Sequence, residues 1–180
     1  MKVLVISGGA PGGNAYNMCQ HFISALPDGW EAVLLDAGSM DIAHCDGCSS
    51  CGGECIHDDD MARVIGEFDT ADAVVFATPI RFNGPSSQIK TVLDRFQILW
   101  KDPDMAVRKK RFMTYMASSG SGNPDLRPCN TIFRSFCLSF GGAWADPLVF
   151  KGTDSSTEGM LDAAERFAVQ FSRTAESTDS

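Results

Sequence analysis

The chain has 180 residues, of which 44% are hydrophobic and 21% charged, values typical of one globular domain. Its 15 Lys and Arg residues against 23 Asp and Glu residues give a net charge of −8, which argues against a nucleic-acid or anionic-membrane partner, because either would need a basic face. No apolar run approaches the ~20 residues that span a bilayer, and the run behind Met1 is too short for a signal peptide, so we expect a cytoplasmic location.

Five short apolar runs alternate along the chain with segments of helical periodicity. The runs predict strands at residues 2–6, 31–36, 72–78, 111–117 and 144–150. Apolar residues three and four apart predict helices at residues 14–26, 58–68, 86–100 and 158–171, and a further helix that carries Ile132, Phe133, Phe136 and Phe140 and ends at Gly141-Gly142. Pro147 interrupts the fifth run and favours a place at the edge of a sheet. We expect residues 1–173 to form one domain and residues 174–180 to be a disordered tail.

This alternation of strand and helix predicts an α/β fold. Strands that are joined by helical crossovers lie parallel, so the sheet should be doubly wound, with helices on both faces in three layers. Five such units most often take the flavodoxin-like strand order 2-1-3-4-5, in which a ligand lies beyond the carboxyl ends of the first and third strands. We therefore expect the loops at residues 7–13, 78–84 and 118–123 to surround a ligand.

The first of these loops is rich in glycine. Gly8, Gly9, Gly12 and Gly13 let the backbone approach a ligand, and the helix from Asn14 adds its positive end, so the loop can bind a phosphate without a cationic side chain. It has neither the Gly-Lys-Ser/Thr of an ATP-binding loop nor the glycine spacing of a dinucleotide fingerprint. It suits a terminal monophosphate such as that of FMN, and the alternative is a turn that only connects strand and helix.

The second loop, residues 78–85, offers Ile80 and Phe82 as an apolar wall, together with backbone donors and the cation Arg81. A flat, amphipathic isoalloxazine ring needs such a wall and a few polar contacts. The alternative is a surface turn whose Phe82 packs into the core. The third loop, residues 118–123, is small and polar and suits N–H contacts to the edge of a ring, although such a segment is also an ordinary loop.

A long loop, residues 37–57, carries four of the seven cysteines. Their spacing is Cys45-x2-Cys48-x2-Cys51-x3-Cys55, as in the bacterial ferredoxin run, where closely spaced thiolates bind iron–sulfur clusters. Three interpretations stay open: a [4Fe–4S] cluster, a set of free or redox-active thiols, and a structural zinc ion.

Several other side chains are assigned to packing or to the solvated surface. Cys19, Cys129 and Cys137 lie on predicted helices, where unpaired cysteines pack as core residues. His44 and His57 flank the cysteine run and are interpreted as solvated loop residues rather than zinc ligands. Lys90, Asp94 and Arg95 are placed on the solvated or dimer-facing side of the helix at residues 86–100.

Three segments of the chain are similar to one known family. They are the opening K-V-L-V-I-S-G-G, the C-x-x-C-x-x-C…C run ahead of Asp59-Asp60-Met61, and A-D-A-V-V-F-A-T-P-I-R-F-N-G-P-S-S-Q-I-K-T-V-L-D-R at residues 71–95. Together they resemble the NAD(P)H-dependent FMN reductase family, whose best-matching branch includes the iron–sulfur flavoproteins. The resemblance implies a flavodoxin-like fold, bound FMN, hydride uptake from NADH or NADPH, and a homodimer or tetramer with the flavin near a subunit interface.

The resemblance also implies where FMN binds: the phosphate on residues 9–15 and the ring against residues 79–84 and 119–120. With the loop analysis, the candidate cofactor-binding residues are Gly8, Gly9, Pro11, Gly13, Asn14, Ala15, Pro79, Ile80, Arg81, Phe82, Asn83, Gly84, Ser119 and Gly120. The candidate metal ligands are Cys45, Cys48, Cys51 and Cys55. No catalytic side chain is assigned, because the flavin itself carries the hydride and electron steps.

The sequence departs from the family pattern in three places. Gly9-Ala10-Pro11 stands where the family often has S-P-R, which leaves the phosphate to backbone groups and lowers the expected affinity. Arg81 stands where the family usually has an aromatic residue; facing the flavin it would stabilise the anionic reduced ring, and the alternative is that it points into solvent. The gap before Cys55 is shorter than in the iron–sulfur flavoproteins, so closure of one cube by Cys55 is tight.

We therefore expect an FMN-dependent oxidoreductase that accepts hydride from NAD(P)H and passes electrons to a quinone, free flavin or another small acceptor. One alternative is an iron–sulfur flavoprotein that carries electrons from a protein donor such as ferredoxin through a [4Fe–4S] cluster and FMN. The other is a flavin- or thiol-based redox sensor without turnover. Iron content separates the first two, and NAD(P)H oxidation with an added acceptor separates the first from the third.

Overall fold

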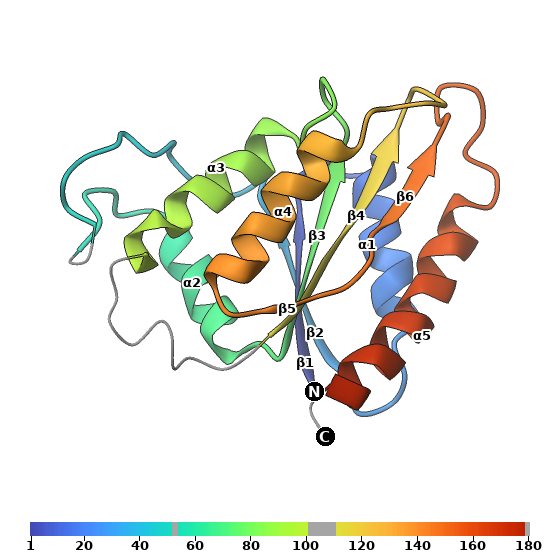
Figure 1. The fold of residues 1–180 in the computed structure, drawn as a ribbon, viewed down its shortest axis with the longest axis horizontal. Coiled ribbons are helices and arrows are strands. Elements are labelled where there is room, and N and C mark those ends of the chain that lie inside the picture. The colour runs from blue at the N-terminus through green and yellow to red at the C-terminus, as the bar shows by residue number, and fades with distance from the viewer. Residues whose placement is uncertain (52–53, 101–110, 179–180) are drawn as a thin grey trace.

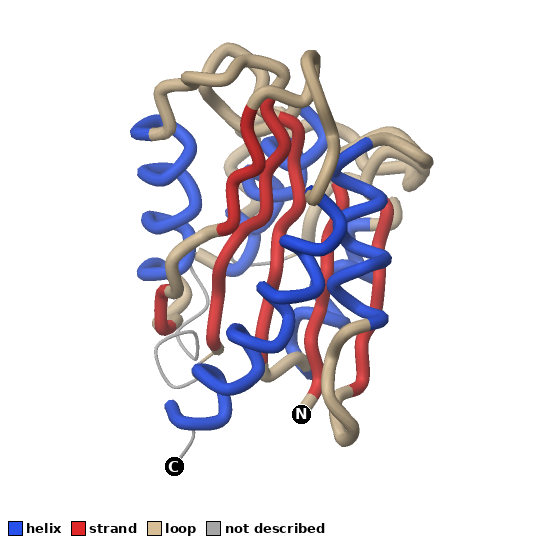
Figure 2. The backbone as a smooth tube through the Cα atoms, turned by 90° about the vertical axis from the view of Figure 1, so that its right-hand side faces the viewer, coloured by secondary structure: helices blue, strands red, loops and turns tan. Residues whose placement is uncertain are grey.

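The computed structural model describes residues 1–51, 54–100 and 111–178, which form a parallel sheet with helices on both faces (Figure 1, Figure 2). The strands are β1 Lys2–Ser7, β2 Glu31–Asp36, β3 Ala73–Pro79, β4 Phe112–Ser119, β5 Ala143–Trp144 and β6 Leu148–Lys151. The helices are α1 Asn14–Ser24, α2 Met61–Thr70, α3 Ser87–Arg95, the 3₁₀ helix η1 Phe96–Leu99, α4 Arg127–Ser139 and α5 Met160–Thr178. Within the described residues, no helix is both long enough and apolar enough to cross a bilayer.

The sheet has the strand order β2-β1-β3-β4-β5, and β6 also pairs with β4. All of these pairings are parallel, so the predicted flavodoxin-like order is confirmed. Side chains alternate along β1: Leu4 and Ile6 pack with α2, α3 and α4, whereas Val3 and Val5 pack with α1 and α5. Because both faces are covered, the central strands are apolar along their whole length, and only the loops at their ends are open to a ligand.

The predicted fifth strand, residues 144–150, is divided into two short strands. Both β5 and β6 pair with β4, but their registers differ by one residue. Pro147 lies between them and has no N–H to donate to the ladder. The hydroxyl of Thr114 on β4 donates to the carbonyl oxygens of Ala145 and Asp146, at 3.1 and 3.2 Å, and so satisfies backbone groups that the interrupted ladder leaves over.

Two helices end differently from the prediction. α3 ends at Arg95 and is followed by η1, where one helix to residue 100 was expected. α5 continues to Thr178, so residues 174–178 of the expected disordered tail are helical, and residues 179–180 lie outside the described part of the chain. The added turns are held by Ala175, which is 2% exposed, and by the Glu176 carboxylate, which accepts from Trp30 Nε1 at 3.0 Å. Trp30 is far from α5 in the sequence, so the apolar periodicity of the helix could not predict this contact.

Candidate functional site

Loops at the carboxyl edge of the sheet surround a cavity of about 530 Å³, a size typical of cofactor sites. The cavity is lined by residues 9–10, 13–15, 79–83, 118–121, 123–124 and 153–154. The three loops that were expected around a ligand meet here, and the loop after β6 joins them. Every candidate cofactor-binding residue lines the cavity except Gly8, Pro11 and Gly84.

The loop between β1 and α1 presents N–H groups at one end of this cavity. Gly13 is the N-cap of α1 and has no side chain to cap the helix, and no acceptor within the described residues is bonded to the N–H groups of residues 14–16. Gly12 has a φ of +73°, a left-handed conformation that favours glycine. The lining residues of this loop are Gly9, Ala10, Gly13, Asn14 and Ala15, which carry no charge. This end therefore fits an anion that is held by backbone dipoles.

Gly8 lies behind this loop, against α3, rather than in the cavity. Its N–H donates to the carbonyl of Ala77 at 2.8 Å, and its carbonyl accepts from the Ser86 hydroxyl at 2.9 Å. A Cβ at this position would lie only 2.3 Å from Cγ1 of Ile89. Gly8 therefore lets the loop pack closely on the start of α3.

Replacing Gly8 by alanine should lower the free energy of unfolding by about 1–3 kcal/mol, the usual cost of an overpacked contact. Ile89→Ala removes the nearest side-chain atom that the new Cβ would meet and leaves Ser86 Oγ at 2.5 Å, so the double variant should lose less stability than the sum of the two single losses. Urea unfolding of the three variants and the wild type measures this coupling. Strictly additive losses would show that the contact between these two residues is not the cause.

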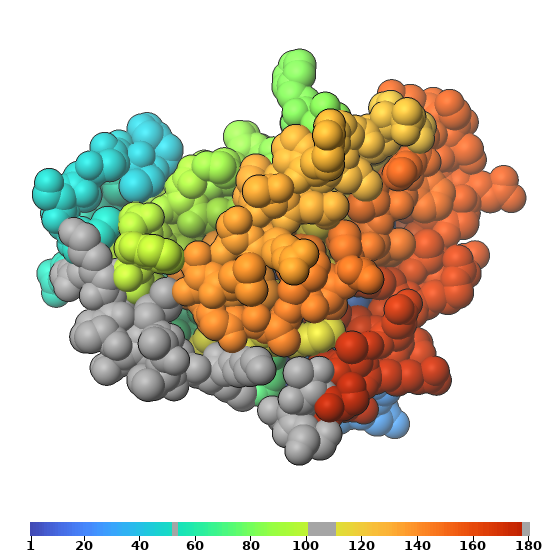
Figure 3. Space-filling model, in the orientation of Figure 1, coloured from blue at the N-terminus to red at the C-terminus, as the bar shows by residue number. Residues whose placement is uncertain are grey.

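The second loop forms a tight turn at the rim of the cavity. The backbones of Arg81 and Gly84 exchange two hydrogen bonds of 2.9 Å, and Phe82 and Asn83 between them both have positive φ, at 47° and 65°. The side chain of Phe82 is fully exposed, so the alternative that it packs into the core is wrong; it lines the cavity at the rim. Ile80 also lines the cavity and packs against the core. The turn at residues 80–84 projects from the surface of the molecule (Figure 3).

Backbone hydrogen bonds join the remaining loops into one wall. Ile80 donates to the carbonyl of Ser118 at 2.8 Å, and Thr153 donates to the carbonyl of Ser119 at 2.9 Å. Sequence reasoning missed Thr153 and Asp154 as lining residues. The signal was present, because both follow the last parallel strand, and parallel strands all end at the same edge of a sheet.

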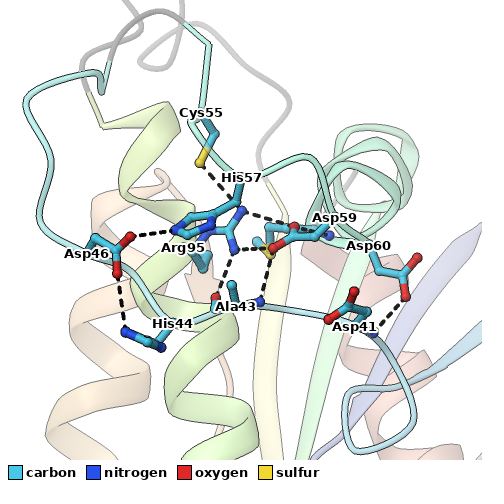
Figure 4. Close-up of polar contacts among 10 residues, drawn as sticks. Asp41, Ala43, His44, Asp46, Cys55, His57, Asp59, Asp60 and Arg95 are labelled. Carbon is cyan, nitrogen blue, oxygen red and sulfur yellow. Dashed lines mark hydrogen bonds and ion pairs between the residues drawn. The ribbon is translucent and has the colours of Figure 1, made fainter.

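A buried arginine ties the cysteine loop to α3 (Figure 4). Arg95 is 4% exposed and donates to the two carboxylate oxygens of Asp59, at 2.5 and 3.0 Å. It also donates to the carbonyl of Ala43 at 2.8 Å and to Cys55 Sγ at 3.5 Å. The expectation that Arg95 lies on a solvated or dimer-facing surface is therefore wrong. Its partner Asp59 is 36 positions away, so no local pattern in the helix reveals the pair.

The loop cysteines Cys45, Cys48, Cys51 and Cys55 all line one cavity beside Arg95. The cavity measures only about 20 Å³, room for roughly one water molecule. Among the described residues, no three His, Cys, Asp or Glu side chains form a group that could hold a metal ion. His44 and His57 lie 3.2 and 3.1 Å from the carboxylate of Asp46 instead. In this arrangement the loop fits neither an iron–sulfur cluster nor a zinc ion.

The other three cysteines are buried in the core, as predicted. Burial raises the pKa of the Cys19 thiol to about 12 and the pKa values of Cys129 and Cys137 to about 11 each. These thiols are therefore protonated at neutral pH, and we expect no nucleophilic or metal-binding chemistry from them.

Comparison with known proteins matches the chain to one protein family. A family model described as NADPH-dependent FMN reductase matches residues 1–134. An iron–sulfur flavoprotein of Methanocaldococcus jannaschii is 41% identical over 131 residues, which cover 65% of this chain and 66% of that protein. One of Archaeoglobus fulgidus is 34% identical over 116 residues, which cover 63% of this chain and 52% of that protein. The chain spans about half the length of most of the curated relatives it matches.

Solved structures share the fold over almost the whole chain. An NAD(P)H:quinone oxidoreductase from Methanothermobacter marburgensis has a TM-score of 0.77 at 13% identity, covering 98% of this chain and 96% of its own. An FMN-dependent NADH-azoreductase from Bacillus anthracis, solved in complex with FMN, has a TM-score of 0.70 at 15% identity, covering 97% of this chain and 100% of its own. At such identities the likeness concerns the fold alone.

Proposed function

The chain belongs to the NADPH-dependent FMN reductase family, and on this premise we propose that it is an FMN-dependent oxidoreductase. Hydride would come from NADH or NADPH, and the electrons would pass to a small acceptor such as a quinone or free flavin. The observation that carries the proposal is the 530 Å³ cavity at the carboxyl ends of β1 and β3, where a doubly wound fold binds its ligand. Its anion-binding end and its loop after β3 fit the two ends of FMN.

Different residues of the cavity would bind the phosphate and the ring of FMN. The N–H groups of residues 14–16 would hold the phosphate, because they lie at the start of α1 and no acceptor among the described residues is bonded to them. Residues 79–83 and 119–120 would hold the ring, with Ile80 as the apolar contact. Bound FMN supplies the hydride and electron chemistry, so the chain needs no acid–base side chain of its own for that step.

Two measurements test this proposal. Titration of the purified chain with FMN, followed by flavin fluorescence, should show saturable binding. Riboflavin should bind more weakly than FMN, because it lacks the phosphate. The complex should then oxidise NADH or NADPH when a quinone is added. A chain that binds no FMN would overturn the proposal, and a chain that binds FMN without turnover would favour the redox sensor.

A second candidate is an iron–sulfur flavoprotein that exchanges electrons with a protein donor such as ferredoxin. Two observations favour it: the four loop cysteines line one cavity, and curated relatives carry that name. The present arrangement of the loop counts against it. Iron and acid-labile sulfide are to be measured on protein purified without oxygen. About four irons per chain would support the cluster, and the absence of iron would reject it.

Arg81 offers a test of the electrostatics of the proposed flavin site. Its side chain is exposed and lines the cavity, and its guanidinium forms no ion pair with another described residue. Replacing Arg81 by tyrosine should lower the midpoint potential of bound FMN by about 10–30 mV, because a cation near the ring favours its anionic reduced form. Arg81→Lys keeps the charge and should leave the potential near that of the wild type. Equal potentials in all three proteins would place Arg81 away from the flavin.

A further inference from the structure

Asp154 is the only carboxylate among the described residues that line the 530 Å³ cavity. It follows β6, in the loop that the sequence did not single out. Within the described part of the chain, its carboxylate oxygens form no hydrogen bond and no ion pair, so no cationic side chain there neutralises it. A negative charge therefore lies on the wall of a cavity whose other end presents N–H groups and suits an anion.

Backbone hydrogen bonds place Asp154, an exposed residue, beside Gly120. Gly152, with a φ of +77°, donates to the carbonyl of Ser121 at 3.0 Å, and Thr153 donates to that of Ser119 at 2.9 Å. A Cβ on Gly120 would lie 2.4 and 2.6 Å from the two carboxylate oxygens of Asp154. The carboxylate thus occupies the space that any side chain at position 120 would need, and the absence of a side chain on Gly120 leaves room for it at the cavity wall.

We propose that Asp154 makes the cavity discriminate against the reduced form of its flavin. This inference rests on the proposed function. Reduction of FMN by two electrons and one proton adds one negative charge to the ring, whereas the oxidised ring is neutral. A carboxylate nearby repels the reduced ring more than the oxidised ring, so the reduced cofactor is bound less tightly and returns its electrons more readily. The charge acts in the direction opposite to that expected of Arg81.

The test compares Asp154→Asn with the wild type. Asparagine keeps the shape of the side chain over Gly120 and removes its charge. Dissociation constants are measured without oxygen for oxidised FMN and for FMN reduced with dithionite. We expect the constant for oxidised FMN to change less than about twofold, and the constant for reduced FMN to fall by about three- to tenfold.

Two further variants separate this effect from a general change. Glu158→Gln removes one negative charge from an exposed residue outside the cavity and should leave both constants unchanged. Asp154→Glu keeps the charge and should keep the wild-type ratio of the two constants. An unchanged ratio in Asp154→Asn overturns the inference while the proposed function stands. A wild type that binds neither form of FMN overturns the proposed function and this inference with it.

Discussion

Replacing Arg95 by methionine should lower the free energy of unfolding by about 3–5 kcal/mol, the cost of leaving one charge of a buried pair alone. The side chains of Arg95 and Asp59 are only 3% and 7% exposed. Without the guanidinium, the Asp59 carboxylate stays buried and loses its cation. The carbonyl of Ala43 loses its donor at the same time.

Helix α3 itself offers the matched control. Lys90 and Asp94 form a pair of 2.7 Å in which both side chains are 48% exposed. Lys90→Met should therefore change stability by only about 0.5 kcal/mol or less. Urea unfolding measures both variants, and similar losses would mean that burial of the Arg95 pair is not the cause. Because Arg95 also contacts Cys55, the loop thiols of Arg95→Met should react faster with a thiol reagent than those of Lys90→Met.

The same pair gives the fold a dependence on acid pH. Burial by itself would raise the pKa of Asp59, but hydrogen bonds from Arg95 and from the N–H groups of Met61 and Ala43 lower it below its ordinary value of 3.8. Since the folded pKa is the lower one, this stabilisation is fully present above the ordinary value and is lost as the pH falls through the folded value. The stability difference between wild type and Asp59→Asn should therefore shrink below about pH 4. A difference that stays constant down to the acid transition would contradict this account.

Replacing Ala10 by aspartate should weaken FMN binding by about 10- to 100-fold. Ala10 lines the anion-binding end of the cavity, and its side chain is exposed, so a carboxylate fits there without disturbing the core. The phosphate would then meet a negative charge where the loop provides only neutral donors. Fluorescence titration with FMN measures the loss.

Riboflavin and asparagine separate charge from shape in this experiment. Riboflavin lacks the phosphate, so its weaker affinity should be nearly the same in Ala10→Asp and the wild type. Ala10→Asn has the same size without the charge and should bind FMN within about threefold of the wild type. If riboflavin and FMN lose affinity equally in Ala10→Asp, the phosphate does not lie at this end of the cavity.

The local pattern of the sequence was sufficient to predict the architecture. Apolar runs such as residues 2–6 can only be buried between two layers, and helical connections force neighbouring strands to lie parallel. These rules lead to one common strand order, and the order decides which loops meet. The glycine-rich loop and residues 79–83 were therefore placed together correctly, although they are far apart in the chain. The three core cysteines were also predicted correctly, because each lies on the apolar face of a helix.

The tertiary structure alone revealed which distant side chains meet. Arg95 has the position of a surface residue in its helix, and only the packing of the cysteine loop on α3 brings Asp59 and Cys55 to it. Asp154 became part of the cavity because the loop after β6 is hydrogen-bonded to the loop after β4. Hydrophobic periodicity predicts which face of a segment is buried, but it does not predict which distant residue a charged side chain contacts. These distant contacts determine the electrostatics around Arg95 and in the cavity with Asp154, so only the tertiary structure could show which charges act there.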